Sequence, residues 1–124
     1  MPILSDSFSD EEKIVSRDWL KVREYVNRVF NKKPDLNAIL FLIGLNELGI
    51  IKSEWSKEEK QDLMHVGLCT IFLKDSYFKF IGNDQDGWPH FEKAGDIDVG
   101  NLRQQEFLIK SRAIRYFKEK SLIQ

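Results

Sequence analysis

The chain has 124 residues, of which 42% are hydrophobic and 31% are charged, and its formal net charge at pH 7 is −1. This length and composition predict one globular domain with its own core, and they exclude a disordered or fibrous chain. The balanced charge argues against a dedicated nucleic-acid binder, because such proteins usually carry a basic excess that contacts phosphates. We therefore predict a single helical domain over residues 1–124, with a flexible N-terminus over residues 1–8.

The sequence also indicates the cellular compartment in which the protein resides. Cys69 is the only cysteine, so the chain cannot form an intramolecular disulfide, and nothing points to an oxidising environment. Residues 1–10 lack the basic and apolar segments of a secretory signal. The longest apolar run, Ala38–Leu45, is far shorter than the roughly 20 residues that span a bilayer. These features predict a cytoplasmic protein without a membrane segment.

The first predicted element is an amphipathic helix. Ser9–Glu12 has the capping-box pattern, in which a serine and a glutamate three residues later satisfy free amides at a helix start. Apolar residues then recur at steps of four and three, which places them on one helix face: Val15, Trp19, Val22, Val26 and Val29. We expect the helix to end near Lys33, ahead of Pro34.

Two further helices are predicted in the middle of the chain. The second helix ends at Gly49 and is apolar on nearly every side, so it lies inside the domain or in an interface between subunits. Gly44 costs about 1 kcal/mol of helix propensity, which close packing against a neighbouring helix would offset. The third helix begins with a second capping box, Ser56–Glu59, and is charged at its start and apolar over Leu63–Leu73.

A β-hairpin and a last helix complete the predicted fold. Strand-forming residues Tyr77–Ile81 precede a turn over Gly82–Gly87 and a return strand over Trp88–Glu92. Pro89 marks the return strand as an edge, because proline has no amide hydrogen to donate. The last helix is predicted over Leu102–Lys120. The fold class is therefore mainly α: a compact four-helix domain with one β-hairpin between the third and last helices.

Three segments resemble a known family. They are DLNAILFLIGLNELG at residues 35–49, KEEKQDLMHVGLC at residues 57–69 and DQDGWPHF at residues 84–91. Together they are similar to a family of small bacterial proteins of about this length, a domain of unknown function. The resemblance spans roughly residues 33–91 and implies a compact bacterial domain. It implies no activity, cofactor or catalytic residue.

One group of residues suggests a metal site. His65 and Cys69 are four residues apart on the third predicted helix, so both side chains can point the same way, as two metal ligands would. His90 in the hairpin is a candidate third ligand. Three carboxylates are candidates for a fourth ligand: Asp62, Asp86 and Glu92. The structural alternative is that Cys69 is a small buried hydrophobe and His65 is packed and hydrogen-bonded.

Other motifs are weaker. Asp84-x-Asp86-Gly87 resembles the middle of an EF-hand loop, but Gly82 and Lys93 occupy the positions of its two strongest calcium ligands. A hairpin turn explains these residues. The sequence has no glycine-rich phosphate loop, nucleophile elbow or HExxH motif, so we predict no cofactor and no catalytic residue.

Two surfaces are candidates for interactions. Tyr77 and Trp88 form an exposed apolar patch of the kind that marks binding sites if they lie on the outer face of the hairpin, and otherwise they pack on the helices. Arg112, Arg115 and Lys118 repeat every three residues on the last helix. They form either a phosphate-facing stripe or a solvated helix face, on which positive charges interact favourably with the helix dipole near its C-terminus. Because the hairpin is acidic, pairing of acidic and basic surfaces between subunits is a further alternative.

These features favour a non-enzymatic protein-interaction module that self-associates, with a second copy or another protein as its partner. One alternative is a nucleic-acid binder built like a winged helix, because the third helix is followed directly by a hairpin. The acidic start of that helix and the acidic hairpin argue against this alternative, since phosphate would repel them. The other alternative is a metal-dependent enzyme that uses His65, Cys69 and His90.

Overall fold

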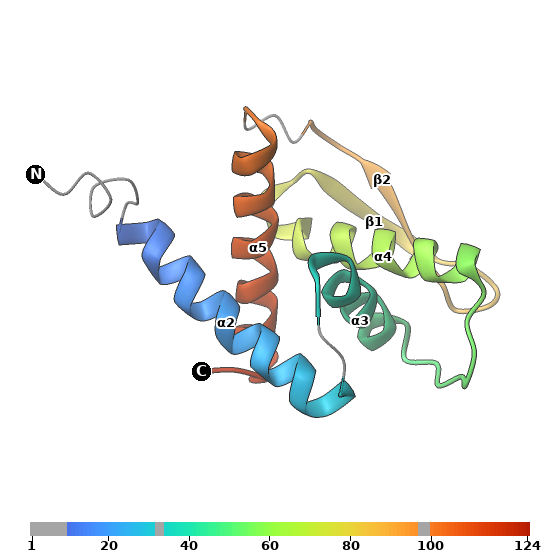
Figure 1. Cartoon of the computed structure of the whole chain (residues 1–124). Coiled ribbons are helices and arrows are strands. Elements are labelled where there is room, and N and C mark those ends of the chain that lie inside the picture. Colours follow the sequence, from blue (N-terminus) through green and yellow to red (C-terminus); the bar gives the residue numbers. More distant parts are fainter. Residues whose placement is uncertain (1–9, 32–33, 97–99) are drawn as a thin grey trace, which may run out of the picture. The chain divides into compact units, whose positions relative to one another are not determined.

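The computed structural model describes residues 10–31, 34–96 and 100–124 (Figure 1). These residues form four α-helices, a short 3₁₀ helix and one antiparallel two-stranded sheet. The hairpin lies between the third and last α-helices in chain order, which confirms the predicted mainly-α class. Residues 1–8 and Ser9 of the first predicted capping box lie outside the described residues. No described helix is long and apolar enough to cross a membrane.

The chain divides into two compact units, residues 1–33 with 99–124 and residues 34–98. In the first unit, α2 (Asp10–Phe30) packs against α5 (Leu102–Glu119). The predicted apolar face of α2 is buried along most of its length: Trp19, Val22 and Val26 are buried and Val15 is half-buried. Val29, in the last turn, is 50% exposed, so the buried face ends one turn earlier than predicted.

Helix α2 ends at Phe30, before the predicted Lys33, which lies outside the described residues. The reason is Asn31, which adopts a left-handed backbone with a φ of 51°. Its amide donates a hydrogen bond of 2.8 Å to the carbonyl of Asn27. Asparagine tolerates this conformation better than most residues and therefore caps a helix C-terminus.

Asp18 is buried between the two helices of the first unit, although it lies among the charged residues of α2. Only 3% of its surface is exposed. Lys118 Nζ on α5 donates a hydrogen bond of 2.8 Å to Asp18 Oδ2, and Lys21 Nζ and Arg17 Nε lie 3.6 and 3.7 Å from Oδ1. The hydrogen bond from Lys118 outweighs partial desolvation and lowers the pKa of Asp18. This ion pair joins α2 to α5.

In the second unit, α3 (Leu36–Leu48) and α4 (Lys57–Ile71) cross at very short range. A Cβ atom on Gly44 would collide with the carbonyl oxygen of Leu63, and one on Gly67 would collide with that of Leu40. The glycines therefore let the two backbones approach, as the sequence analysis expected for Gly44. This crossing also gives the apolar surface of α3 a partner inside the unit.

The predicted helix ends in this unit are confirmed. Gly49 caps α3 with a φ of 72°, and its amide donates to the Leu45 carbonyl at 2.9 Å. At the start of α4, the Ser56 hydroxyl accepts from the Glu59 amide at 3.1 Å, and the Glu59 carboxylate accepts from the Ser56 amide at 2.9 Å. These caps satisfy backbone groups that would otherwise lack partners.

After the 3₁₀ helix η1 (Leu73–Asp75), strands β1 (Phe78–Asn83) and β2 (Pro89–Lys93) form the hairpin. Phe80 lies opposite Phe91, and the centres of their rings are 5.8 Å apart. The register shifts between Phe80 and Gly82, so Ile81 is an extra residue in β1. This bulge interrupts the regular alternation of side chains between the two faces of a strand.

Candidate functional site

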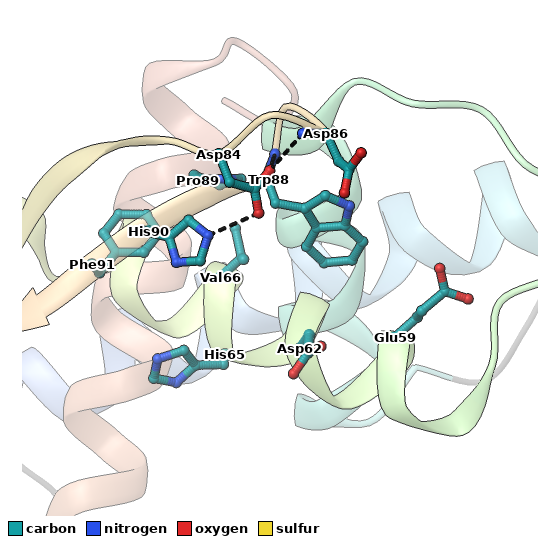
Figure 2. Close-up of a pocket in the computed structure, with 10 residues that line it drawn as sticks. All are labelled: Glu59, Asp62, His65, Val66, Asp84, Asp86, Trp88, Pro89, His90 and Phe91. Atoms are coloured by element: carbon teal, nitrogen blue, oxygen red, sulfur yellow. Dashed lines mark hydrogen bonds and ion pairs between the residues drawn. The ribbon is translucent and has the colours of Figure 1, made fainter.

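The second unit has a groove between helix α4 and the hairpin (Figure 2). Its volume is about 470 Å³, within the range of roughly 300–1,000 Å³ that ligand pockets occupy. Two elements line it: Glu59, Asp62, His65 and Val66 from α4, and Asp84, Asp86, Trp88, Pro89, His90 and Phe91 from the hairpin. Four lining residues are carboxylates and none of the lining residues is lysine or arginine. The groove is therefore acidic when its histidines are neutral.

Asp84 organises the hairpin side of the groove. Its Oδ1 atom accepts hydrogen bonds from the backbone amides of Asp86 and Trp88, at 2.9 and 3.0 Å. Its Oδ2 atom lies 2.9 Å from His90 Nε2, and Figure 2 marks this interaction with a dashed line. The hydrogen bond with His90, followed by that from the Trp88 amide, lowers the pKa of Asp84. Both oxygens of this carboxylate are used within the hairpin, where they hold the turn and the His90 ring in place.

Beside the groove, the chain holds a lysine ammonium between an indole and a carboxylate. Lys52 Nζ lies 4.7 Å from the centre of the Trp55 ring and 2.6 Å from Glu59 Oε2. The hydrogen bond from Lys52 is the main cause of the lowered pKa of Glu59. Trp55 in turn contacts Trp88 edge to face, with ring centres 6.2 Å apart and planes at 77°. The two indoles thus link the lysine contact to the groove.

Asp62 and Asp86 are the other two carboxylates of the groove, and both residues are exposed. Among the described residues, neither carboxylate has a hydrogen-bond or ion-pair partner. In the view of Figure 2, the Trp88 indole lies between Asp86 of the turn and Asp62 of α4. Trp88 itself is half-buried. The groove therefore presents an indole and two carboxylates that no described side chain neutralises.

Of the three predicted metal ligands, two lie in contact with each other and the third pairs with another residue. His65 Nε2 lies 3.4 Å from Cys69 Sγ, so these two side chains meet as predicted. His90 instead pairs with Asp84. Over residues 10–31, 34–96 and 100–124, no group of three or more histidine, cysteine, aspartate or glutamate side chains could hold a metal ion. The three-ligand hypothesis, with Asp62, Asp86 or Glu92 as a fourth, thus has no geometric support.

The environment of Cys69 agrees with the structural alternative. Its side chain has no exposed surface, and burial raises the pKa of its thiol to about 11. The thiol is therefore protonated at neutral pH, which makes it a poor metal ligand and a poor nucleophile. His65 contacts Phe78 edge to face at 6.2 Å, but it remains exposed rather than fully packed.

The hairpin aromatics do not form the patch considered in the sequence analysis. Tyr77 is half-buried and contacts the buried Phe72 edge to face at 5.5 Å, and Trp88 packs on Trp55. The exposed apolar side chains of the hairpin are instead Phe80 and Ile81, at 49% and 58% exposure. Both residues lie next to the shift in register between Phe80 and Gly82.

Two residues of the predicted basic stripe on α5, Arg112 and Lys118, contact other residues of the first unit. Lys118 forms the ion pair with buried Asp18. Arg112 donates to the Ser111 hydroxyl at 3.2 Å, and both Arg112 and Arg115 are half-buried. Lys118 nevertheless remains exposed, and the choice between a phosphate-facing stripe and a solvated helix face stays a prediction.

Comparison of the chain with protein-family models, curated proteins and solved structures gives no match. The resemblance of residues 33–91 to small bacterial proteins therefore stays a prediction. The groove of the second unit, with its indole and carboxylates, is the basis for a functional proposal.

Proposed function

We propose that this chain is a non-enzymatic protein-interaction module and that the groove between α4 and the hairpin holds its partner. The observation that carries the proposal is the half-buried Trp88 indole in a concave surface, with the carboxylates of Asp62 and Asp86 left without described partners. Tryptophan anchors dominate many protein interfaces, because one rigid side chain supplies a large contact area.

The chemistry of the groove supports binding over catalysis. Both oxygens of Asp84 are engaged by the turn amides and His90. The thiol of Cys69 does not line the groove, and it is buried and protonated at neutral pH. The acidic lining also disfavours the winged-helix alternative, because DNA and RNA backbones would be repelled from it. A protein surface with positive charge is the better match.

Another protein is favoured over a second copy of this chain. The apolar excess of α3 motivated the prediction of self-association, but α3 packs closely on α4 through Gly44 and Gly67. The basic residue Lys118, a candidate contact for an acidic surface of a second copy, already pairs with Asp18. Self-association stays a prediction with its own test below.

Site-specific photo-cross-linking in native cells tests the proposal. A benzophenone side chain replaces Gln85, an exposed residue of the turn between Asp84 and Asp86, and in a control it replaces Asn37, an exposed residue of α3. We expect Gln85 to cross-link reproducibly to one protein, Asn37 not to do so, and Trp88→Ala to remove the cross-link. Cross-linking that is equal from both positions, or that survives Trp88→Ala in a folded variant, would contradict the proposal.

A further inference from the structure

We propose that the contact between His90 and Asp84 is a pH-sensitive latch, which holds the turn that carries Trp88 more tightly when the histidine is protonated. This inference rests on the proposed function, because it names how the groove that holds the partner is regulated. Three features support it: the contacts of the Asp84 carboxylate, the charge of the groups around His90, and the small number of side chains that titrate near neutral pH.

One carboxylate ties the turn together. Asp84 Oδ1 accepts hydrogen bonds from the backbone amides of Asp86 and Trp88. Asp84 Oδ2 lies 2.9 Å from His90 Nε2, and the Asp84 amide donates to the Trp88 carbonyl at 2.9 Å. A change in the strength of the His90 contact therefore acts on the same side chain that holds the backbone of Trp88, the anchor of the proposed interface.

Protonation changes the kind of bond that His90 makes. A neutral imidazole can donate one N–H to the Asp84 carboxylate, which joins a neutral group to an anion. Protonation adds the attraction between two opposite charges. The hydrogen bond with His90 is the main cause of the lowered pKa of Asp84, so this carboxylate stays ionised at the mildly acidic pH at which histidine side chains gain a proton.

The charged groups around His90 are mostly carboxylates. Figure 2 shows three titratable side chains of α4 across the groove from the hairpin. The charged and titratable groups that face His90 from both elements are Asp84, Asp86, Glu92 and Lys79 on the hairpin, and Glu59, Asp62 and His65 on α4. Of these carboxylates, Glu59 pairs with Lys52 and Glu92 lies opposite Lys79. The remaining carboxylates attract a positive charge on the imidazole, and no lysine or arginine lines the groove to repel it.

Few side chains can imitate this behaviour near neutral pH. Histidine is the side chain whose ordinary pKa places its change of charge between pH 5 and 8, and the chain has two histidines, His65 and His90. Burial raises the pKa of the single thiol, Cys69, to about 11. His65 contacts Cys69 within α4, at 3.4 Å. It therefore serves as the internal control for a histidine that does not hold the turn.

Amide exchange with water, followed by NMR of the full ¹⁵N-labelled chain, tests the latch without a partner. The readout is the protection of the Trp88 backbone amide, which is its intrinsic exchange rate divided by the measured rate at the same pH. We expect this protection to be about threefold greater at about pH 5.5 than at about pH 7.5. The factor is small because the side chains of His90 and Asp84 are 57% and 39% exposed, and exposed ion pairs contribute little.

Two histidine variants locate the effect. His90→Gln keeps an N–H donor for Asp84 but cannot gain a charge, so we expect the protection of the Trp88 amide to be the same at both pH values. His65→Gln is the matched control and should keep the threefold difference. A parent protein with equal protection at both pH values, a difference that survives His90→Gln, or one that is lost in His65→Gln would overturn the proposal.

The two proposals fail in different ways. If the protection of the Trp88 amide does not change with pH while the Gln85 cross-link still depends on Trp88, the latch is wrong and the interaction proposal stands. If the protection changes as expected but the cross-link does not depend on Trp88, the turn responds to pH, and both the interaction proposal and the regulatory role of the latch are wrong.

Discussion

Replacing Gly44 with alanine tests how closely α3 and α4 approach. A methyl group at this position would overlap the carbonyl oxygen of Leu63, which belongs to the backbone of α4 and cannot rotate away. The two helices would have to separate or tilt. We therefore expect Gly44→Ala to destabilise the protein, even though alanine is the better helix former.

The expected size follows from two opposing effects. Alanine gains about 1 kcal/mol of helix propensity over glycine. Overpacking of a filled core costs typically 1–3 kcal/mol and sometimes more, and a collision with backbone lies at the upper end of that range. The net loss in free energy of unfolding should therefore be about 2 kcal/mol. Gly67→Ala should behave alike, because its methyl group would overlap the Leu40 carbonyl.

Urea unfolding followed by far-UV circular dichroism measures this loss. Gly95→Ala is the matched control: its added methyl group would meet its nearest atom, the Ser76 carbonyl oxygen, at 3.6 Å, which is ordinary contact. We expect the control to change the free energy of unfolding by about 1 kcal/mol at most, and in the stabilising direction. If Gly44→Ala were as stable as the parent protein, the close crossing of α3 and α4 would be wrong.

Three further predictions follow from the ion pair, the thiol and the oligomeric state. Lys118→Met should lower the free energy of unfolding at pH 7 by about 1–2 kcal/mol, less than for a fully buried pair, because Lys118 and Lys21 are each 44% exposed. Because the pKa of Asp18 is lowered in the folded state, the ion pair contributes to the free energy of unfolding at pH values above the unfolded pKa near 3.9. This contribution is lost as the pH falls through the pKa of Asp18 in the folded state. Equal urea midpoints of parent and variant at pH 7 would contradict the prediction. Cys69 should react with a thiol reagent at pH 8 only after unfolding in urea, and rapid reaction of the native protein would show that the thiol is accessible. Sedimentation velocity tests the predicted self-association. We expect the fraction of a larger species to rise with protein concentration, and a single monomeric species at all concentrations would contradict the prediction.

The local features of this fold were readable from the sequence. The capping box at Ser56, the glycine cap at Gly49 and the period of apolar residues around Val22 each depend on residues within one or two helical turns. The turn chemistry before Trp88 is equally local, because Asp84 binds amides only two and four residues away. Sequence reasoning succeeds in such cases because the interacting groups are close along the chain.

The features that sequence reasoning missed depend on distant or register-dependent contacts. Asp18 lies among charged residues in α2, and its partner Lys118 is 100 residues away, so no local pattern marks its burial. The bulge at Ile81 depends on how β2 pairs with β1. The contact of Trp55 with Trp88 beside the groove also joins side chains that are far apart along the chain. A tryptophan just before a capping box was the available signal, but spacing alone does not say what it contacts.

The division of the chain has a consequence for its synthesis. Residues 34–98 form one contiguous unit, whereas the other unit combines segments from both sides of them in the sequence. On the ribosome, the contiguous unit can complete its contacts before α5 is made, whereas α2 gains its partner in the first unit only when α5 emerges. Folding the middle first shortens the flexible chain between α2 and α5, which lowers the entropy lost when they meet.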